Sequence, residues 1–224
     1  MFEILTLVAI FFVSIFASFI GAMVGGGGLL LIPFLIFLGI PPQVAIATNK
    51  MGALGLSLGA TYHFWKEKKI LWKYVPLFAI LSIVGAYFGA NLLLSINDEV
   101  VNVAVGITIL LILPFLFIKK EIGVKHTEVS KLKKIIGAIL YFFVMIFGGF
   151  FGGGYGTIVI YILMLFFGFT IINANATDII PCFLLALASL IIFSINDIVD
   201  YRVGIILFVG MLLGGHLGAH VAIK

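Results

Sequence analysis

The sequence predicts an all-α polytopic membrane protein, and three observations lead to this fold class. Of the 224 residues, 63% are hydrophobic and only 10% are charged, whereas about 25% of the residues of an ordinary soluble domain are charged. The apolar residues form nine runs, most of them near the roughly 20 residues that cross a bilayer as a helix. The charged residues gather between these runs. These features exclude a soluble domain, a disordered chain, a nucleic-acid-binding module and a disulfide-stapled secreted fold.

We expect nine membrane crossings, one for each apolar run. They cover residues 4–24, 27–40, 45–65, 72–94, 100–118, 135–152, 156–168, 174–193 and 203–223. The second and seventh are short and bordered by glycine on both sides, so we expect them to be tilted, broken or re-entrant. The first run follows Glu3 rather than a basic segment and ends in glycines rather than in an A-x-A site. We therefore expect it to be a retained span and not a signal peptide.

The charges of the loops predict the orientation in the membrane. The loop after the third run carries four lysines and one glutamate, and the loop after the fifth carries six lysines and two glutamates. Both should face the cytoplasm by the positive-inside rule. Alternation over nine crossings then places the N-terminus and the acidic loops, at residues 98–99 and 197–202, outside. We expect a multi-pass protein of the cell (cytoplasmic) membrane with cytoplasmic basic loops.

The two halves of the chain repeat in one constant register. Residues 47–49 read Ala-Thr-Asn and residues 176–178 read Ala-Thr-Asp, and the same shift carries the aromatic-basic pair at 72–73 to the pair at 201–202. We call this shift, from position 49 to position 178, the repeat offset. Five crossings, an odd number, separate equivalent segments, so the repeats should have inverted topology. Inverted repeats with short, glycine-interrupted segments at corresponding positions are typical of secondary transporters.

This repeat divides the chain into three parts. Residues 1–118 form the first transmembrane repeat, 119–134 a cytoplasmic basic loop and 135–224 the second repeat. The counterpart of the fifth run would begin after residue 224, so we expect the second repeat to lack its last helix.

Two glycine-rich segments, each leading into a short apolar run, are the first candidate binding elements. Their residues are Gly25, Gly26, Gly27, Gly28, Gly153, Gly154, Tyr155 and Gly156. Backbone amides without side chains can approach a ligand closely, and a helix N-terminus carries about +0.5 of an elementary charge. Such ends suit a small anion. The alternative is that the glycines only permit close helix packing, as small residues do in membranes.

Polar residues near the start of the third and eighth runs complete the candidate substrate site: Thr48, Asn49, Lys50, Thr177 and Asp178. Helix capping explains one member of each set but not Lys50, because a cation near a helix N-terminus opposes the helix dipole. A charge within a span usually faces a partner or a wet cavity. Lys50 either snorkels to the interface or is the countercharge of an anion. We expect Lys50 and Asp178 to meet near the substrate, and Asp178 or a nearby histidine to carry a coupling proton.

The histidines and the cysteine give no metal or catalytic assignment. His216 and His220 lie four residues apart on one helix face, a spacing that also suits metal ligands. No acidic or cysteine partner lies near them in the sequence and no HExxH motif is present, so polar helix packing is favoured over a proton relay or a metal site. Cys182 lies alone in an apolar run and is expected to be a small packed hydrophobe.

Three sequence segments resemble the first half of the TauE/SafE family of membrane proteins, the sulfite and sulfonate exporters. They are residues 25–33 (GGGGLLLIP), 39–42 (GIPP) and 45–50 (AIATNK). The second half matches more loosely. The resemblance implies a transporter that moves small sulfur oxyanions or organosulfonates out across the cytoplasmic membrane. Asp178 is followed by Ile-Ile-Pro with no lysine, which argues against a symmetric two-lysine site.

The sequence therefore predicts a secondary transporter and not an enzyme. It would export a small anion, sulfite or an organosulfonate, by alternating access at a midplane site. Glycine-rich helix ends would bind the anion, Thr48, Asn49 and Thr177 would hydrogen-bond it, and Lys50 would balance its charge. No P-loop is present, so direct ATP coupling is not expected.

Other functions stay open at this stage. They are a cation- or proton-conducting transporter or channel that uses Asp178, a membrane-embedded enzyme built on the histidines, and a non-transport scaffold. The expected partners are the small anion, the lipid bilayer and a coupling proton, with no nucleic acid and no cofactor. A homo-oligomer is compatible with the sequence.

Overall fold

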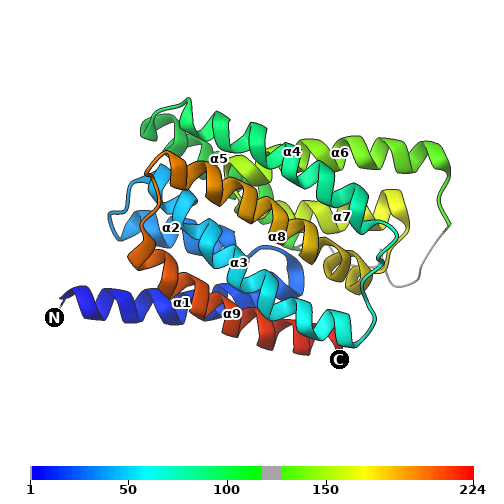
Figure 1. Cartoon of the computed structure of the whole chain (residues 1–224), viewed down its shortest axis with the longest axis horizontal. Coiled ribbons are helices and arrows are strands. Elements are labelled where there is room, and N and C mark those ends of the chain that lie inside the picture. Colours follow the sequence, from blue (N-terminus) through cyan, green and yellow to red (C-terminus); the bar gives the residue numbers. More distant parts are fainter. Residues whose placement is uncertain (1, 118–127) are drawn as a thin grey trace.

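The computed structural model describes residues 2–117 and 128–224, and all regular structure within them is helical. The helices lie side by side along one long axis (Figure 1). They are α1 (Phe2–Val24), α2 (Gly28–Phe37), α3 (Pro42–Lys66), α4 (Val75–Leu94), α5 (Asp98–Phe117), α6 (Lys131–Phe150), α7 (Tyr155–Phe167), α8 (Ile171–Ile195) and α9 (Tyr201–Ile223). The predicted all-α fold class is confirmed. Most of the predicted basic loop, at 119–134, lies outside the described residues.

Five helices of the described residues are long and apolar enough to cross a membrane: α1, α4, α6, α8 and α9. The helix α3 has 25 residues, but Asn49, Lys50 and several glycines lower its hydropathy. The short apolar helices α2 and α7 have 10 and 13 residues, a rise of about 15 and 20 Å. Neither spans the roughly 30 Å hydrocarbon core alone. The expectation that the second and seventh segments are short is confirmed.

Helix boundaries and backbone conformations recur at the repeat offset. A shift of α3 by this offset gives the bounds of α8, and the start of α1 coincides in the same way with the start of α6. The two non-glycine residues with positive φ among those described, Lys68 (52°) and Asp197 (55°), are also related by it. In Figure 1, α3 and α8 run in opposite directions, as do α4 and α9.

The fourth helix of each half packs on helices of the other half. Helix α4 contacts α6 and α8, whereas α9 contacts α1 and α3. Glycine makes the approach close: a Cβ added at Gly89 would lie 2.1 Å from the carbonyl oxygen of Ile146, and one at Gly218 would lie 2.3 Å from that of Phe19. The repeat offset relates these two glycines. The exchange of α4 and α9 joins the two halves in one bundle.

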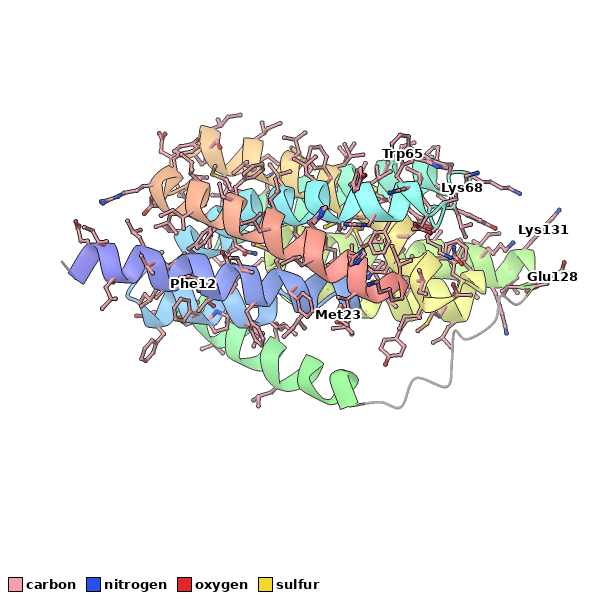
Figure 2. The ribbon with its side chains drawn as sticks, turned by 90° about the horizontal axis from the view of Figure 1, so that it is seen from below. Phe12, Met23, Trp65, Lys68, Glu128 and Lys131 are labelled. Carbon is pink, nitrogen blue, oxygen red and sulfur yellow. The ribbon has the colours of Figure 1, made fainter. Side chains whose placement is uncertain are left out.

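Lysines of the two basic loops gather at one end of the bundle. Lys68 and Lys131, from the two basic loops, lie at the same end (Figure 2). At the other end, where the chain begins, Arg202 lies 3.9 Å from the carboxylate of Glu3. The long axis of the molecule therefore runs from a basic end to the end that carries the N-terminus.

Candidate functional site

Two helix breaks meet near the middle of the bundle. The first separates α1 from α2 and the second separates α6 from α7. Gly25 (φ 83°) and Gly154 (φ 76°) have left-handed backbones, which glycine adopts without strain. A Cβ at Gly25 would lie 2.5 Å from the carbonyl carbon of Gly156, so the two loops touch through their backbones. Met23, just before the first break, lies near the middle of the long axis (Figure 2).

A small cavity of about 70 Å³ lies beside the crossing loops. Six helices and both loops contribute to its wall. The lining residues are Gly21, Gly25, Gly27, Gly28, Asn49, Ala53, Leu56, Gly152, Tyr155, Gly156, Ile160, Asn175, Asp178, Ile179, Cys182 and Met211. Because a cavity needs about 10–15 Å³ to hold one water molecule, this cavity accommodates a ligand of only a few heavy atoms.

The N-termini of two short helices face this cavity. Gly27 and Gly28 line it at the start of α2, and Tyr155 and Gly156 line it at the start of α7. Neither N-terminus has a side-chain cap. The first N–H groups of a helix lack partners within the helix and lie at the positive end of its dipole. The cavity wall is therefore suited to a small anion.

The glycine-rich segments predicted from the sequence are divided between the wall and the loops behind it. Five of the eight line the cavity: Gly25, Gly27, Gly28, Tyr155 and Gly156. Gly26, Gly153 and Gly154 do not, and they belong to the breaks that set the direction of α2 and α7.

Asn49 is the polar side chain of α3 that reaches the cavity. It is only 3% exposed, it lines the cavity, and its Oδ1 has no hydrogen-bond partner among the described residues. A buried polar atom without a partner costs about 1–3 kcal/mol. This amide is therefore available to a ligand in the cavity.

Asp178 brings a carboxylate to the same cavity from α8. It is 6% exposed, and its Oδ1 accepts a hydrogen bond of 2.7 Å from the hydroxyl of Tyr141. That hydroxyl lies 3.2 Å from the hydroxyl of Ser82. The acid is thus held by a buried polar chain that extends from the cavity toward α4 and α6.

Lys50 does not line the cavity, although the sequence places it beside Asn49. Its side chain is buried and its Nζ donates a hydrogen bond of 2.6 Å to the carbonyl oxygen of Gly148, in the last turn of α6. The carbonyls at a helix C-terminus lack partners and carry negative partial charge, so a cation is favourable there. Nζ also lies 2.9 Å from the position of a Cβ on Gly152. The ammonium therefore lies next to Gly152, a loop residue that lines the cavity.

The expectation that Lys50 and Asp178 meet is wrong, because each is held by a different partner. Within the described residues no ion pair joins them. The interfacial alternative for Lys50 is also wrong, since its side chain is 1% exposed.

The two threonines lie inside helices and not at their starts. Thr48 and Thr177 are each the seventh residue of their helix, and Thr170 caps α8 instead. The Thr48 hydroxyl accepts the N–H of Asp200, and the Thr177 hydroxyl accepts the N–H of Leu71, both at 3.0 Å. The repeat offset relates the two donors as well as the two acceptors. The prediction that one member of each polar set caps its helix is therefore wrong, because Pro41 and Thr170 precede α3 and α8, and neither Thr48 nor Thr177 lines the cavity.

Two polar residues that line the cavity, Cys182 and Asn175, were not among the predicted site residues. The thiol of Cys182 accepts hydrogen bonds from Tyr155 Oη at 2.8 Å and from Ser57 Oγ at 3.4 Å, so it has polar partners that a packed hydrophobe lacks. Asn175 donates to the carbonyl oxygen at position 22, in the last turn of α1. Residues 175, 178 and 182 are spaced as one helix face, and this spacing is the signal that would have found them.

The three histidines of the described residues, His63, His216 and His220, form a separate cluster between α3 and α9. The Nε2 atoms of His63 and His216 are 3.2 Å apart, and the rings of His63 and His220 lie 5.0 Å apart. None of them lines the cavity. In the described part of the chain, no group of three His, Cys, Asp or Glu side chains is arranged to hold a metal ion. Polar packing between the two helices accounts for the cluster.

The helical fold has five helices able to span a membrane and a small internal cavity, and it defines a multi-pass membrane protein. A family model described as sulfite exporter TauE/SafE matches residues 10–224. This chain belongs to that family, which is a family of membrane transporters and not of enzymes.

Several bacterial proteins are similar to this chain over most of its length. A probable membrane transporter protein of Haemophilus influenzae is 32% identical over 214 residues, which cover 95% of this chain and 84% of that protein. The probable membrane transporter protein YfcA of Escherichia coli is 28% identical, with 98% and 82% covered. The corresponding values for YunE of Bacillus subtilis, also named a probable membrane transporter protein, are 28%, 93% and 85%. No solved structure matches the chain significantly.

Proposed function

We propose that this protein is a secondary transporter that exports a small anion, sulfite or an organosulfonate, by alternating access at the central cavity. The observation that carries the proposal is the convergence of two uncapped helix N-termini on one buried cavity. The positive ends of the two helix dipoles, where no side chain caps the helix, attract a compact anion. Asn49 adds a neutral amide to the wall: its NH2 group can donate to an anion, whereas its unpartnered Oδ1 accepts only from a ligand that carries a proton. The family description supports a sulfur oxyanion.

The proposed topology consists of two inverted repeats, at residues 1–118 and 135–224, joined by the basic segment 119–134. Opposite helix directions (Figure 1) and the equivalent hydrogen bonds of Thr48 and Thr177 support this division. In this topology α2 and α7 enter the membrane only part of the way, because their lengths do not span it. The basic end faces the cytoplasm by the positive-inside rule, and the membrane is the cytoplasmic membrane.

Lys50 acts in this proposal through the loop and not by contact with the anion. Its ammonium fixes the end of α6 and adds positive charge behind Gly152, which lines the cavity. Thr48 and Thr177 hold the surrounding helices, so we now assign them a structural role in place of direct hydrogen bonds to the anion.

Asp178 favours a second candidate function, proton or cation transport. A carboxylate in the wall of a small cavity, held by Tyr141, repels an anion unless it takes up a proton. Coupled entry of a proton and an anion satisfies both observations, whereas conduction of a cation alone uses only Asp178.

The proposal is tested by sulfite counterflow in proteoliposomes. We expect saturable counterflow by the wild-type protein and a loss of at least about tenfold in Asn49→Ala, the effect of about 1.4 kcal/mol. The matched control is Asn91→Ala, because Asn91 is exposed on α4 and its amide bonds only to its own helix. Asp178→Asn should remove the acceleration by an imposed pH gradient.

Two results would overturn the proposal. The first is an absence of counterflow of sulfite, taurine and sulfoacetate by a folded wild-type protein. The second is unchanged sulfite counterflow in Asn49→Ala. A cation current that needs no anion and is lost in Asp178→Asn establishes the second candidate.

A further inference from the structure

A second cavity, far larger than the first, is an open groove on the outer surface along the seam of α4 and α6. Its volume is about 520 Å³. Leu77 and Leu81 from α4, Ala138 and Phe142 from α6, and Phe167 at the end of α7 are among its lining residues. All five side chains are apolar. In a membrane such a surface lies against hydrocarbon and not against water.

One end of this groove is cationic. Lys134 and Tyr74 are its polar lining residues; Lys134 Nζ lies 3.4 Å from Tyr74 Oη and 5.8 Å from the centre of the ring. Lys131 and Lys133 are exposed in the first turn of α6, and exposed Lys73 precedes Tyr74 in the chain. Lys134 thus lines one end of an apolar groove, and three more lysines lie near it or near Tyr74 in the chain, at the end of the bundle where Figure 2 shows Lys131 and the acidic residue Glu128.

The polar end and the apolar part of the groove lie on one face of α6. Lys134, Ala138 and Phe142 are successive turns of one face of α6, and α4 begins at the same end of the bundle (Figure 1). From Lys134 to Phe142 the helix rises about 12 Å. This length is close to the half-thickness of a hydrocarbon core of about 30 Å. The groove therefore follows one leaflet from its headgroup level inward.

We propose that this groove is a binding site for one anionic phospholipid of the leaflet at the basic end. The lipid phosphate contacts Lys134 and Tyr74, and an acyl chain lies along the seam of α4 and α6. The assignment depends on the coincidence of cationic and apolar parts in one groove, and it is independent of the substrate in the central cavity.

The charge of the groove selects this occupant. A zwitterionic lipid brings its own cation to a site that already holds lysines. A second copy of the chain, docked by the same face, places its lysines against these lysines. An anionic headgroup neutralises them, as basic sites between membrane helices do on the cytoplasmic side.

Lipid retention measured by native mass spectrometry tests the assignment. The protein in neutral detergent is incubated with phosphatidylglycerol or phosphatidylcholine of identical acyl chains. We expect one phosphatidylglycerol to be retained per chain, and Lys134→Ala to weaken retention about fivefold. Lys134→Arg should keep it. The matched control is Lys66→Ala, which removes an exposed lysine in the last turn of α3, outside the groove.

A second variant tests the apolar part of the groove. Ala138→Phe fills it, so retention of phosphatidylglycerol should fall even though Lys134 is intact. Equal retention of the two lipids by the wild-type protein, or unchanged retention in folded Lys134→Ala, would overturn the assignment. A lipid-free dimer cross-linked between α6 helices would overturn it also, by identifying a second copy as the occupant.

Discussion

At the scale of single residues, Lys50 shows how a buried charge is accommodated in a membrane protein. Its ammonium binds the carbonyl oxygen of Gly148 at the negative end of α6. This contact gives Lys50 a partner that is not acidic, and Asp178 separately accepts a hydrogen bond from the hydroxyl of Tyr141. Each charge has its own polar partner, and the cavity lies between the helices that carry them.

Lys50→Gln separates the two roles assigned to this lysine. Glutamine keeps an N–H donor for the carbonyl of Gly148 but removes the positive charge behind the cavity. We expect a folded protein whose affinity for sulfite falls on the order of tenfold, the effect of about 1.4 kcal/mol. Binding is measured by isothermal titration, and thermal unfolding checks the fold. An unchanged affinity limits Lys50 to the capping of α6.

At the scale of helices, α3 and α8 are equivalent elements that carry one threonine each at the same position. Thr48 binds the segment before α9, at the end of the bundle that carries the N-terminus. Thr177 binds the segment before α4, at the basic end of the bundle. A transport cycle by alternating access opens the two ends in turn. The two hydrogen bonds should therefore oppose opening at opposite ends.

Substitution by valine, which removes the hydroxyl but keeps the branched shape, should shift the cycle in opposite directions. Thr48→Val should increase labelling of Cys182 by a membrane-impermeant maleimide added outside. Thr177→Val should increase labelling from the cytoplasmic side. Cys182 is the only cysteine of the chain and lines the cavity, so it reports both events. Equal changes from both sides in both variants would contradict the opposed roles.

At the scale of the whole molecule, the separation of charge gives a direct test of topology. Lys68 and Asp197 are equivalent by the repeat and share a left-handed backbone, but they belong to a basic and an acidic loop. In a Cys182→Ser background, Asp197→Cys should be labelled from outside and Lys68→Cys only after the membrane is opened. Labelling of both from one side is incompatible with inverted repeats.

Features set by local sequence were predictable from the chain alone. Long apolar runs form helices because each helix satisfies its own backbone hydrogen bonds within the membrane. Glycine runs at residues 25–28 and 152–154 interrupt them because glycine tolerates left-handed backbones. The repeat offset is visible in the sequence, and the helix bounds recur with the same offset.

The partners of the polar residues could not be predicted in this way. Gly148 is 98 residues from Lys50, and Asp200 is 152 residues from Thr48. Contacts of this kind depend on which helix faces are packed together, and no local pattern contains that information. The sequence therefore identified Asn49 and Asp178 as polar residues within spans, but it also placed Lys50 and both threonines at a site that they do not line.

The sequence by itself determined a helical membrane protein with two broken helices, a repeat and a basic end, because composition, periodicity and glycine act over short stretches of chain. Only the tertiary structure decided that the two breaks touch and that Asn49, Asp178 and Cys182 share one cavity. The physical reason is that the cavity lies between residues from opposite halves of the chain. Gly25 contacts Gly156, and Asn49 faces Asp178 and Cys182 across one cavity, so no stretch of sequence contains the whole site.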